Sequence, residues 1–245
     1  MNSFYDGEGN NIVIESEMNA SVLDYLTDAF STVICIGDSV TEGVGSVSDY
    51  TKVKNYSYPT RLAKMTGWTI ENAGKAGLTA LQWWQQIFAN YDYSNYQIAL
   101  IELGLNNGLT DTIETDCAGN DYTQYADTNT GGYCKIIEGI KAQNENIFIV
   151  LLISSGIGAT TKDVINKIGK KYNLPVIDLT DRTYMNLAES KYHPVLSGGN
   201  VDYIHLNIMG YLAKAKLIHL GLSEAINNNI VDINSMLTVI ANAEQ

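Results

Sequence analysis

The sequence predicts an α/β fold in which a parallel sheet of mainly five strands lies between two layers of helices, a three-layer α/β/α sandwich. Two observations predict it. Five short apolar runs of strand length are spaced along the chain, and segments with helical spacing of apolar residues separate them. Strands that alternate with helices form βαβ units, with parallel strands and with helices on both faces of the sheet. At 245 residues, the chain is long enough for one such domain with some residues to spare at its ends.

The predicted strands are runs of mainly aliphatic and β-branched residues, the residue types that favour strands. They cover residues 32–36, 68–72, 98–103, 147–154 and 174–178. The predicted helices have apolar residues at helical spacing or a proline in the first turn. They cover residues 59–65, 81–89, 133–142, 163–172 and 206–220. We expect the chemistry in the loops that follow the strands, because open α/β sheets bind their ligands at the carboxyl ends of the strands.

The composition is ordinary for a soluble globular domain, with 45% hydrophobic and 17% charged residues. The net charge of −12 argues against nucleic acid and against an anionic membrane surface as partners. No run approaches the ~18 apolar residues that a membrane span needs. The N-terminus of this sequence lacks the basic and apolar regions of a signal peptide, so we expect a soluble protein that is not secreted by that route.

Both ends of the chain differ from the central domain, which we place at residues 31–221. Residues 1–30 are predicted to be an extension with a lead-in helix, and residues 12–14 within it form a strand-like run. Residues 222–245 carry apolar side chains at intervals of three and four, as in an amphipathic helix. This helix either packs on its own domain or joins a second copy of the chain in a coil, and both interpretations remain open.

The three cysteines lie in different surroundings. Cys35 falls within the first predicted strand, where we expect it to be a small buried hydrophobe. Cys117 and Cys134 flank a polar, glycine-rich stretch. A disulfide between these two is one interpretation and a pair of free thiols is the other, because a reducing compartment opposes the bond.

The most informative feature is the turn Gly37-Asp38-Ser39-Val40, directly after the first predicted strand. It places a hydroxyl at the edge of the sheet where ligands bind. A serine in this place is either an N-cap of the following helix or a nucleophile. The choice depends on whether the sequence also supplies a base and a group to orient that base.

Three other turns supply such partners. Residues 72–79 follow the second strand as a glycine-rich turn, which presents backbone N–H groups and allows close approach of a substrate. Residues 104–108 follow the third strand and carry two side-chain amides. Asp202 and His205 stand three residues apart, just before the last predicted helix. Taken singly, each of these has a structural interpretation as a cap, a turn residue or a packed side chain.

Taken together and in this order, the four segments resemble the SGNH hydrolases, also called the GDSL esterase and lipase family. The matching residues are Gly37-Asp38-Ser39, Gly77, Gly104-Leu105-Asn106, Asp202 and His205. One position departs from the family pattern, since Asn107 stands where the family usually has Asp. The resemblance covers about residues 32–220 and implies a flavodoxin-like SGNH fold.

The resemblance also implies a serine esterase. Ser39 would be the nucleophile, and His205 would be the base that takes its proton and later the acid that protonates the leaving group. Asp202 would orient the imidazole and stabilise its charged form. The oxyanion hole would consist of the backbone N–H groups of Ser39 and Gly77 and the side-chain amide of Asn106.

No cofactor and no metal ion are expected, because no cluster of His, Cys and carboxylate residues has the spacing of a zinc site or an EF-hand. The other two histidines, His193 and His219, lack an acidic partner at useful spacing. We expect them at the surface or in packing.

The expected substrate is a carbohydrate that carries short acyl groups, most simply acetate. Residues 109–132 form a long polar connection at the catalytic rim, and such loops usually shape specificity. Their shortage of aliphatic residues argues against a tunnel for a long acyl chain. Within the resembled family, carbohydrate O-deacetylases are a common class. Candidates for the substrate rim are Asp38, Asn107 and Trp83.

Two other functions remain open: a glycan-binding or adhesion module that no longer turns over substrate, and a lipase or thioesterase of the same family. Residues 5–10 and the predicted C-terminal helix also resemble parts of phage tail or fibre proteins that carry a deacetylase. A virion-associated homo-oligomer, joined through that helix, is therefore a further hypothesis beside a cytoplasmic protein.

Overall fold

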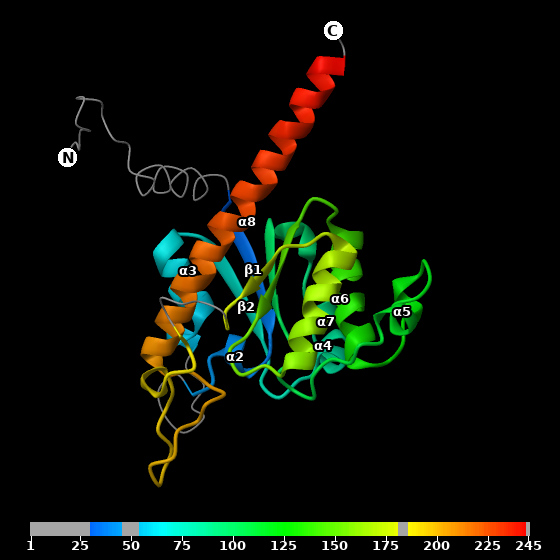
Figure 1. The fold of residues 1–245 in the computed structure, drawn as a ribbon. Coiled ribbons are helices and arrows are strands. Elements are labelled where there is room, and N and C mark those ends of the chain that lie inside the picture. The colour runs from blue at the N-terminus through cyan, green and yellow to red at the C-terminus, as the bar shows by residue number, and fades with distance from the viewer. Residues whose placement is uncertain (1–29, 46–53, 181–185, 244–245) are drawn as a thin grey trace, which may run out of the picture.

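The computed structural model describes residues 30–45, 54–180 and 186–243, with side chains in the last helix described to residue 226. Its centre is one sheet of five parallel strands (Figure 1). They are β1 (Thr32–Gly37), β2 (Thr69–Gly74), β3 (Ile98–Glu102), β4 (Phe148–Ile153) and β5 (Val176–Asp178). The predicted fold class is confirmed. The predicted extension and its strand-like run lie outside the described residues.

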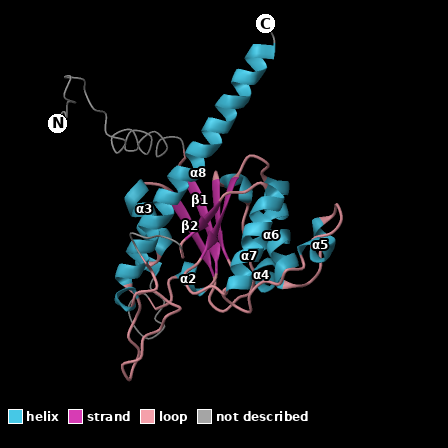
Figure 2. Cartoon of the chain, viewed as in Figure 1, coloured by secondary structure: helices cyan, strands magenta, loops and turns pink. Residues whose placement is uncertain are grey.

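Helices cover both faces of the sheet (Figure 2). They are α2 (Ser39–Glu42), α3 (Tyr58–Thr66), α4 (Ala80–Gln86), α5 (Ile113–Asp116), α6 (Asn129–Gln143), α7 (Ala159–Tyr172) and α8 (Ile208–Ala243). Helix α6 begins four residues before the predicted start, because Thr128 caps it by accepting the N–H of Gly131. Apolar spacing does not reveal that first turn, which contains two glycines.

Alternate residues of β1 point to opposite faces of the sheet and define two cores. Val33 and Cys35 belong to the core that α3 and α8 cover. Ile34 and Ile36 belong to the core that α4, α6 and α7 cover. All four side chains are fully buried, so β1 reads in the sequence as one continuous apolar run.

The C-terminal part of the chain is a single helix, α8, rather than two separate segments. Its buried residues Tyr211, Ala215, Ile218 and Leu222 recur at intervals of four, three and four, and they face the sheet. Figure 1 shows α8 continuing past the end of the sheet. Whether that projecting end packs or oligomerises stays a prediction. Among the described helices, none is both long and apolar enough to span a membrane.

The strand order indicates where on the sheet a ligand site is expected. It runs β2-β1-β3-β4-β5, so the chain reverses its direction of winding between β1 and β3. Ligands of such flavodoxin-like sheets bind beside this reversal, at the carboxyl ends of the strands. Ser39 follows β1 and Asn106 follows β3, so both residues lie at the reversal.

The long connection after β3 is partly helical and contributes side chains to the core. It contains α5, and its side chains Leu109, Ile113 and Tyr125 are buried. A disulfide joins Cys117 to Cys134 and so ties this connection to α6, which settles the pairing that the sequence left open. Cys35 is a buried free thiol, as predicted.

Candidate active site

Ser39 is the first residue of α2, and its hydroxyl contacts the histidine that the sequence suggests as its partner. The distance from Ser39 Oγ to His205 Nε2 is 3.0 Å. The cap of α2 is Asp38, whose Oδ1 accepts the N–H of Val40 at 3.0 Å. Since another residue performs the capping, the Ser39 side chain is left to face the imidazole.

Asp202 holds the imidazole from the other side. Its Oδ2 lies 2.7 Å from His205 Nδ1, and its Oδ1 accepts the N–H groups of Ile204 at 2.9 Å and of His205 at 3.2 Å. Burial opposes the charged carboxylate, but the Ile204 N–H and the His205 ring outweigh it and hold the pKa of Asp202 below its ordinary value. Asp202 therefore faces the imidazole as a carboxylate.

His193 is a packing residue, and it packs against the backbone of His205. It is 2% exposed. Its Nδ1 lies 2.7 Å from the carbonyl oxygen of His205, and its Nε2 lies 2.8 Å from that of Leu187. The Asn207 amide donates to the His193 carbonyl at 3.0 Å. These contacts hold the loop that carries His205. The sequence does not reveal them, because the partners of His193 are backbone carbonyls and not acidic side chains.

The glycine turn after β2 packs directly on α2. Glu42 Oε2 accepts the N–H of Ala76 at 2.7 Å. A Cβ on Gly74 would lie 2.2 Å from the backbone nitrogen of Glu42, so only glycine permits this approach. Gly77 adopts φ 81°, in the left-handed region that favours glycine. The turn and α2 therefore form one packed unit.

The loop after β3 brings a side-chain amide to the same place. Asn106 Nδ2 donates to the carbonyl of Leu78 at 3.1 Å, which fixes the plane of the amide and leaves it a second N–H. The next residue, Asn107, is exposed and has φ 59°. After glycine, Asn is among the residues best suited to that left-handed conformation. This is a physical reason for Asn at the one position that departs from the family pattern.

These residues surround one pocket of about 430 Å³. Its lining consists of Ser39, Val44, Ala76, Gly77, Leu105, Asn106, Gly156, Ile204 and His205. The structure thus brings together the predicted nucleophile, the predicted base and the predicted oxyanion donors from four loops. The sequence analysis missed Gly156, although Ser154-Ser155-Gly156 is a small-residue turn at the carboxyl end of the fourth strand. A turn at the carboxyl end of a strand is where open α/β sheets bind ligands, so the sequence could have indicated this residue.

None of the predicted substrate-rim residues Asp38, Asn107 and Trp83 lines this pocket. Trp83 is fully buried in the core, where its Nε1 donates to the carbonyl of Ala73 at 3.0 Å. Asp38 is 1% exposed. None of residues 109–132 lines the pocket either, since that connection packs along α6 and α7.

Asp38 is buried next to Ser39 in the chain, and its Oδ2 has no hydrogen-bond partner among the described residues. Burial raises its pKa to about 7, and the charge of Glu102 adds to the rise, against the opposing effects of the Val40 N–H and Lys214. The folded protein therefore binds a proton on Asp38 more tightly than the unfolded chain does. The raised pKa of Asp38 therefore contributes to the stability of the fold. This contribution is fully present below the ordinary pKa of 3.8 and is lost as the pH rises through about 7.

The stability of the Asp38→Asn variant, relative to that of the wild type, should therefore increase as the pH rises. Between pH 5 and pH 8, we expect the free energy of unfolding of the variant relative to the wild type to increase by roughly 3 kcal/mol, because pH 5 lies two units below the Asp38 pKa of about 7 and one unit corresponds to about 1.4 kcal/mol. Urea unfolding of both proteins at the two pH values measures it. Asp92→Asn is the matched control, since Asp92 caps a short helix in the same way but is fully exposed. A difference that does not change with pH would contradict the raised pKa.

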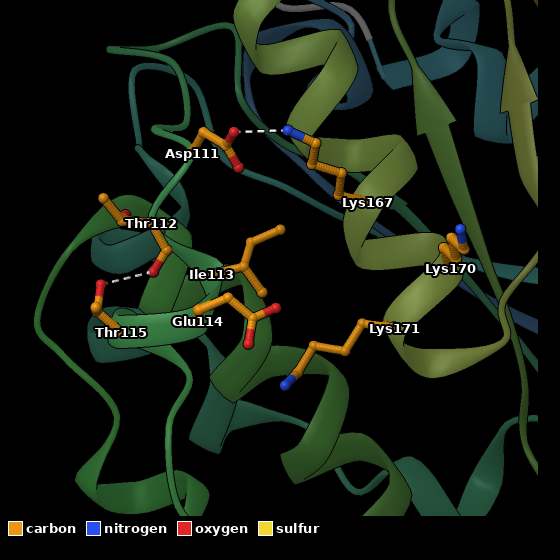
Figure 3. A pocket seen from close by; sticks show the side chains of 8 residues that line it. All are labelled: Asp111, Thr112, Ile113, Glu114, Thr115, Lys167, Lys170 and Lys171. Atoms are coloured by element: carbon orange, nitrogen blue, oxygen red, sulfur yellow. Dashed lines mark hydrogen bonds and ion pairs between the residues drawn. The ribbon is translucent and has the colours of Figure 1, made fainter.

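A second hollow, of about 460 Å³, lies between α5 and α7 (Figure 3). It is lined by Asp111, Thr112, Ile113, Glu114, Thr115, Lys167, Lys170 and Lys171. Lys167 Nζ pairs with Asp111 at 2.6 Å and with Asp163 at 2.9 Å. The described residues that line this hollow include charged side chains but no nucleophile paired with a base, so we look for the chemistry in the pocket at Ser39. Within the described ranges, no three His, Cys, Asp or Glu side chains gather as a metal site.

Comparison with solved structures supports the fold. A Bacteroides ovatus protein assigned to the GDSL-like lipases has a TM-score of 0.54 at 14% identity, over 80% of this chain and 99% of the other. A two-domain esterase active on acetylated mannans has a TM-score of 0.57 at 16% identity, over 84% and 53%. A family two carbohydrate esterase from Clostridium thermocellum, in complex with cellohexaose, has a TM-score of 0.51 at 14% identity, over 82% and 64%. No curated protein matches the chain.

The family itself is shown by a match to a sequence profile, which covers residues 35–213 and is described as the GDSL-like lipase/acylhydrolase family. The matched range includes all the residues on which the resemblance rests. The chain therefore belongs to the GDSL-like lipase/acylhydrolase family, the SGNH hydrolases.

Proposed function

We propose that the protein is a serine esterase that removes short acyl groups, most simply acetyl, from a carbohydrate. The observation that carries the proposal is the hydrogen-bonded chain from Ser39 Oγ through the His205 ring to Asp202, with distances of 3.0 Å and 2.7 Å, at the wall of a pocket. A serine hydroxyl is a weak nucleophile near pH 7 until a base takes its proton, and this arrangement provides the base.

The reaction would proceed through an acyl-enzyme. Ser39 Oγ attacks the ester carbonyl carbon while His205 Nε2 takes its proton, and a tetrahedral oxyanion forms. His205 then gives that proton to the departing sugar oxygen, which leaves as an alcohol. In the second half, His205 takes a proton from water as the water attacks the acyl carbon. His205 then gives that proton to Ser39 Oγ as the bond from Oγ to the acyl carbon breaks, which releases the carboxylic acid and restores the Ser39 hydroxyl. Asp202 stabilises the imidazolium in both halves.

Three donors are available to meet the oxyanion. Ser39, as the first residue of α2, has a backbone N–H with no acceptor in its own helix. Gly77 and Asn106 line the same pocket, and the Asn106 amide retains one N–H beyond its bond to Leu78. In serine hydrolases, one such donor contributes about 3–4 kcal/mol to transition-state stability.

Two observations support the substrate class. The pocket is small, about 430 Å³, and four of its nine lining residues are glycine or small and polar: Ser39, Gly77, Asn106 and Gly156. Two proteins of similar fold are a carbohydrate esterase with a bound cello-oligosaccharide and an esterase active on acetylated mannans. We therefore propose a short acyl group on a sugar.

One observation favours a lipase-type substrate instead. Tyr203, Ile204 and Met209, beside the His205 loop, are 59%, 53% and 64% exposed, and Ile204 lines the pocket. These side chains offer an apolar surface to a longer acyl chain. This second candidate differs from the first in the length of acyl chain that it predicts.

The acyl-length profile tests the proposal. With p-nitrophenyl acetate, butyrate and octanoate, we expect kcat/KM to be highest for acetate and about tenfold or more lower for octanoate, because a small pocket cannot enclose a long chain. Free acetate released from acetylated mannan, measured beside its chemically deacetylated form, tests the sugar. Faster hydrolysis of octanoate than of acetate would contradict the short-acyl assignment and support the lipase candidate.

A further inference from the structure

Directly behind the nucleophile helix, the protein buries a charged pair that the reaction described above does not use. Glu102 is the last residue of β3 and is 2% exposed, and Lys214 in α8 is 0% exposed. Lys214 Nζ forms an ion pair with Glu102 Oε1. Removing two charges from water is costly, and a packed apolar pair in the same place is often as stable or more stable. The pair therefore calls for a role beyond stability.

The pair is fully coordinated by its surroundings. Lys214 Nζ also donates to Ser154 Oγ at 3.3 Å and lies 5.2 Å from the centre of the Tyr58 ring. The second carboxylate oxygen, Glu102 Oε2, accepts the hydroxyl of Thr41 at 3.2 Å. Thr41 Oγ1 also lies 3.3 Å from Tyr58 Oη. Each charged group thus has its partners in place, as a buried network requires.

This network joins the elements that lead into the active site. Glu102 is followed by the loop that carries Asn106, and Ser154 is followed by the turn that carries Gly156. Lys214 lies in the helix that begins three residues after His205. Thr41 lies in α2, two residues after the nucleophile. One ion pair therefore connects four of the five segments that line the pocket.

Helix α2 depends on such an anchor because it has only four residues, too few to be stable alone. Its end is held by Glu42, which accepts the N–H of Ala76, and its middle by Thr41. Gly37, at the end of β1, packs tightly against Thr41, since a Cβ on Gly37 would lie 2.0 Å from Thr41 Oγ1. A shift of Thr41 would therefore shift Ser39.

We propose that Glu102 and Lys214 are positioning residues, whose ion pair acts through Thr41 to hold Ser39 Oγ within hydrogen-bond distance of His205 Nε2. The inference rests on the proposed esterase function. It assigns the pair to the chemical step rather than to substrate binding, because a displacement of about 1 Å in a reacting group can cost about 100-fold in rate.

The first test replaces both charges at once, with E102L/K214M, which keeps similar volumes and leaves no unpaired charge. We expect a cooperatively folded protein with a melting temperature close to or above that of the wild type. We expect kcat for p-nitrophenyl acetate to fall about tenfold or more while KM stays within about threefold. A folded double variant with the wild-type kcat would overturn the proposal.

The second test leaves the ion pair intact and removes its link to α2, together with the contact between Thr41 Oγ1 and Tyr58 Oη. Thr41→Val deletes the hydroxyl at nearly constant shape, and Thr41→Ser is the matched control that retains it. We expect kcat to fall about tenfold or more in T41V with little change in KM, and T41S to restore most of it. If E102L/K214M does not fold, this pair of variants decides the question, and equal kcat values for T41V and T41S would overturn the proposal.

A third measurement separates this inference from the proposed function. The rate at which a fluorophosphonate labels Ser39, followed by intact mass, reports the activation of the hydroxyl without any assumed substrate. If the wild type is labelled but hydrolyses no ester, the proposed function fails, while slower labelling of T41V than of T41S still supports the positioning role. Equal labelling rates for the two variants would overturn it.

Discussion

Ser39→Ala is expected to reduce kcat for ester hydrolysis by about 10⁴-fold or more, because no other hydroxyl among the described residues lines the pocket beside His205. The residual rate would come from the oxyanion donors acting on a direct attack by water. The fold should be unaffected, since Asp38 rather than Ser39 caps α2. Initial rates with p-nitrophenyl acetate and a thermal unfolding curve measure the two effects.

This variant also separates an enzyme from a binding module. A carbohydrate that binds at the pocket should still bind to S39A, and titration calorimetry with an acetylated oligosaccharide measures that. Ser190→Ala, which removes an exposed hydroxyl in a short helix away from the pocket, is the matched control and should keep full activity. Hydrolysis that persists undiminished in S39A would show that Ser39 is not the nucleophile and would favour the non-catalytic interpretation of this pocket.

Local sequence was enough to predict the positions where the site residues meet. Ser39 and Asn106 each follow an apolar run, and the carboxyl ends of parallel strands share one edge of a sheet. The three-residue spacing of Asp202 and His205 suits a single turn, which the 2.7 Å contact between their side chains demonstrates. These features depend on neighbours in the chain or on the general geometry of α/β sheets, so they can be read before the structure is known.

Features that depend on tertiary packing could not be predicted from the sequence. Trp83 and Trp84 are adjacent, and helical spacing alone cannot decide which of them faces the core; it is Trp83 that is fully buried. Glu102 and Lys214 are 112 residues apart, and no local pattern relates them. The disulfide between Cys117 and Cys134 depends on how the connection after β3 folds back on α6. In each case the information lies in tertiary packing.

Asn106→Ala is expected to lower kcat by about 10²–10³-fold, with little change in KM, because its amide is the one side-chain donor assigned to the oxyanion. An interaction that forms only in the transition state affects kcat, whereas one that binds the substrate affects KM. Steady-state kinetics with p-nitrophenyl acetate separates the two parameters. The result would assign Asn106 to the chemical step.

The control for this variant must reproduce the other bond that is lost, from Asn106 Nδ2 to the carbonyl of Leu78 at 3.1 Å. Asn166 Nδ2 donates to the carbonyl of Lys162 at the same distance, on the exposed side of α7 and away from the pocket. Asn166→Ala should therefore leave kcat unchanged. A fall in kcat of less than about threefold in N106A would contradict a donor role, since the backbone N–H groups of Ser39 and Gly77 would then account for the oxyanion by themselves. A large rise in KM at constant kcat would instead assign Asn106 to substrate binding.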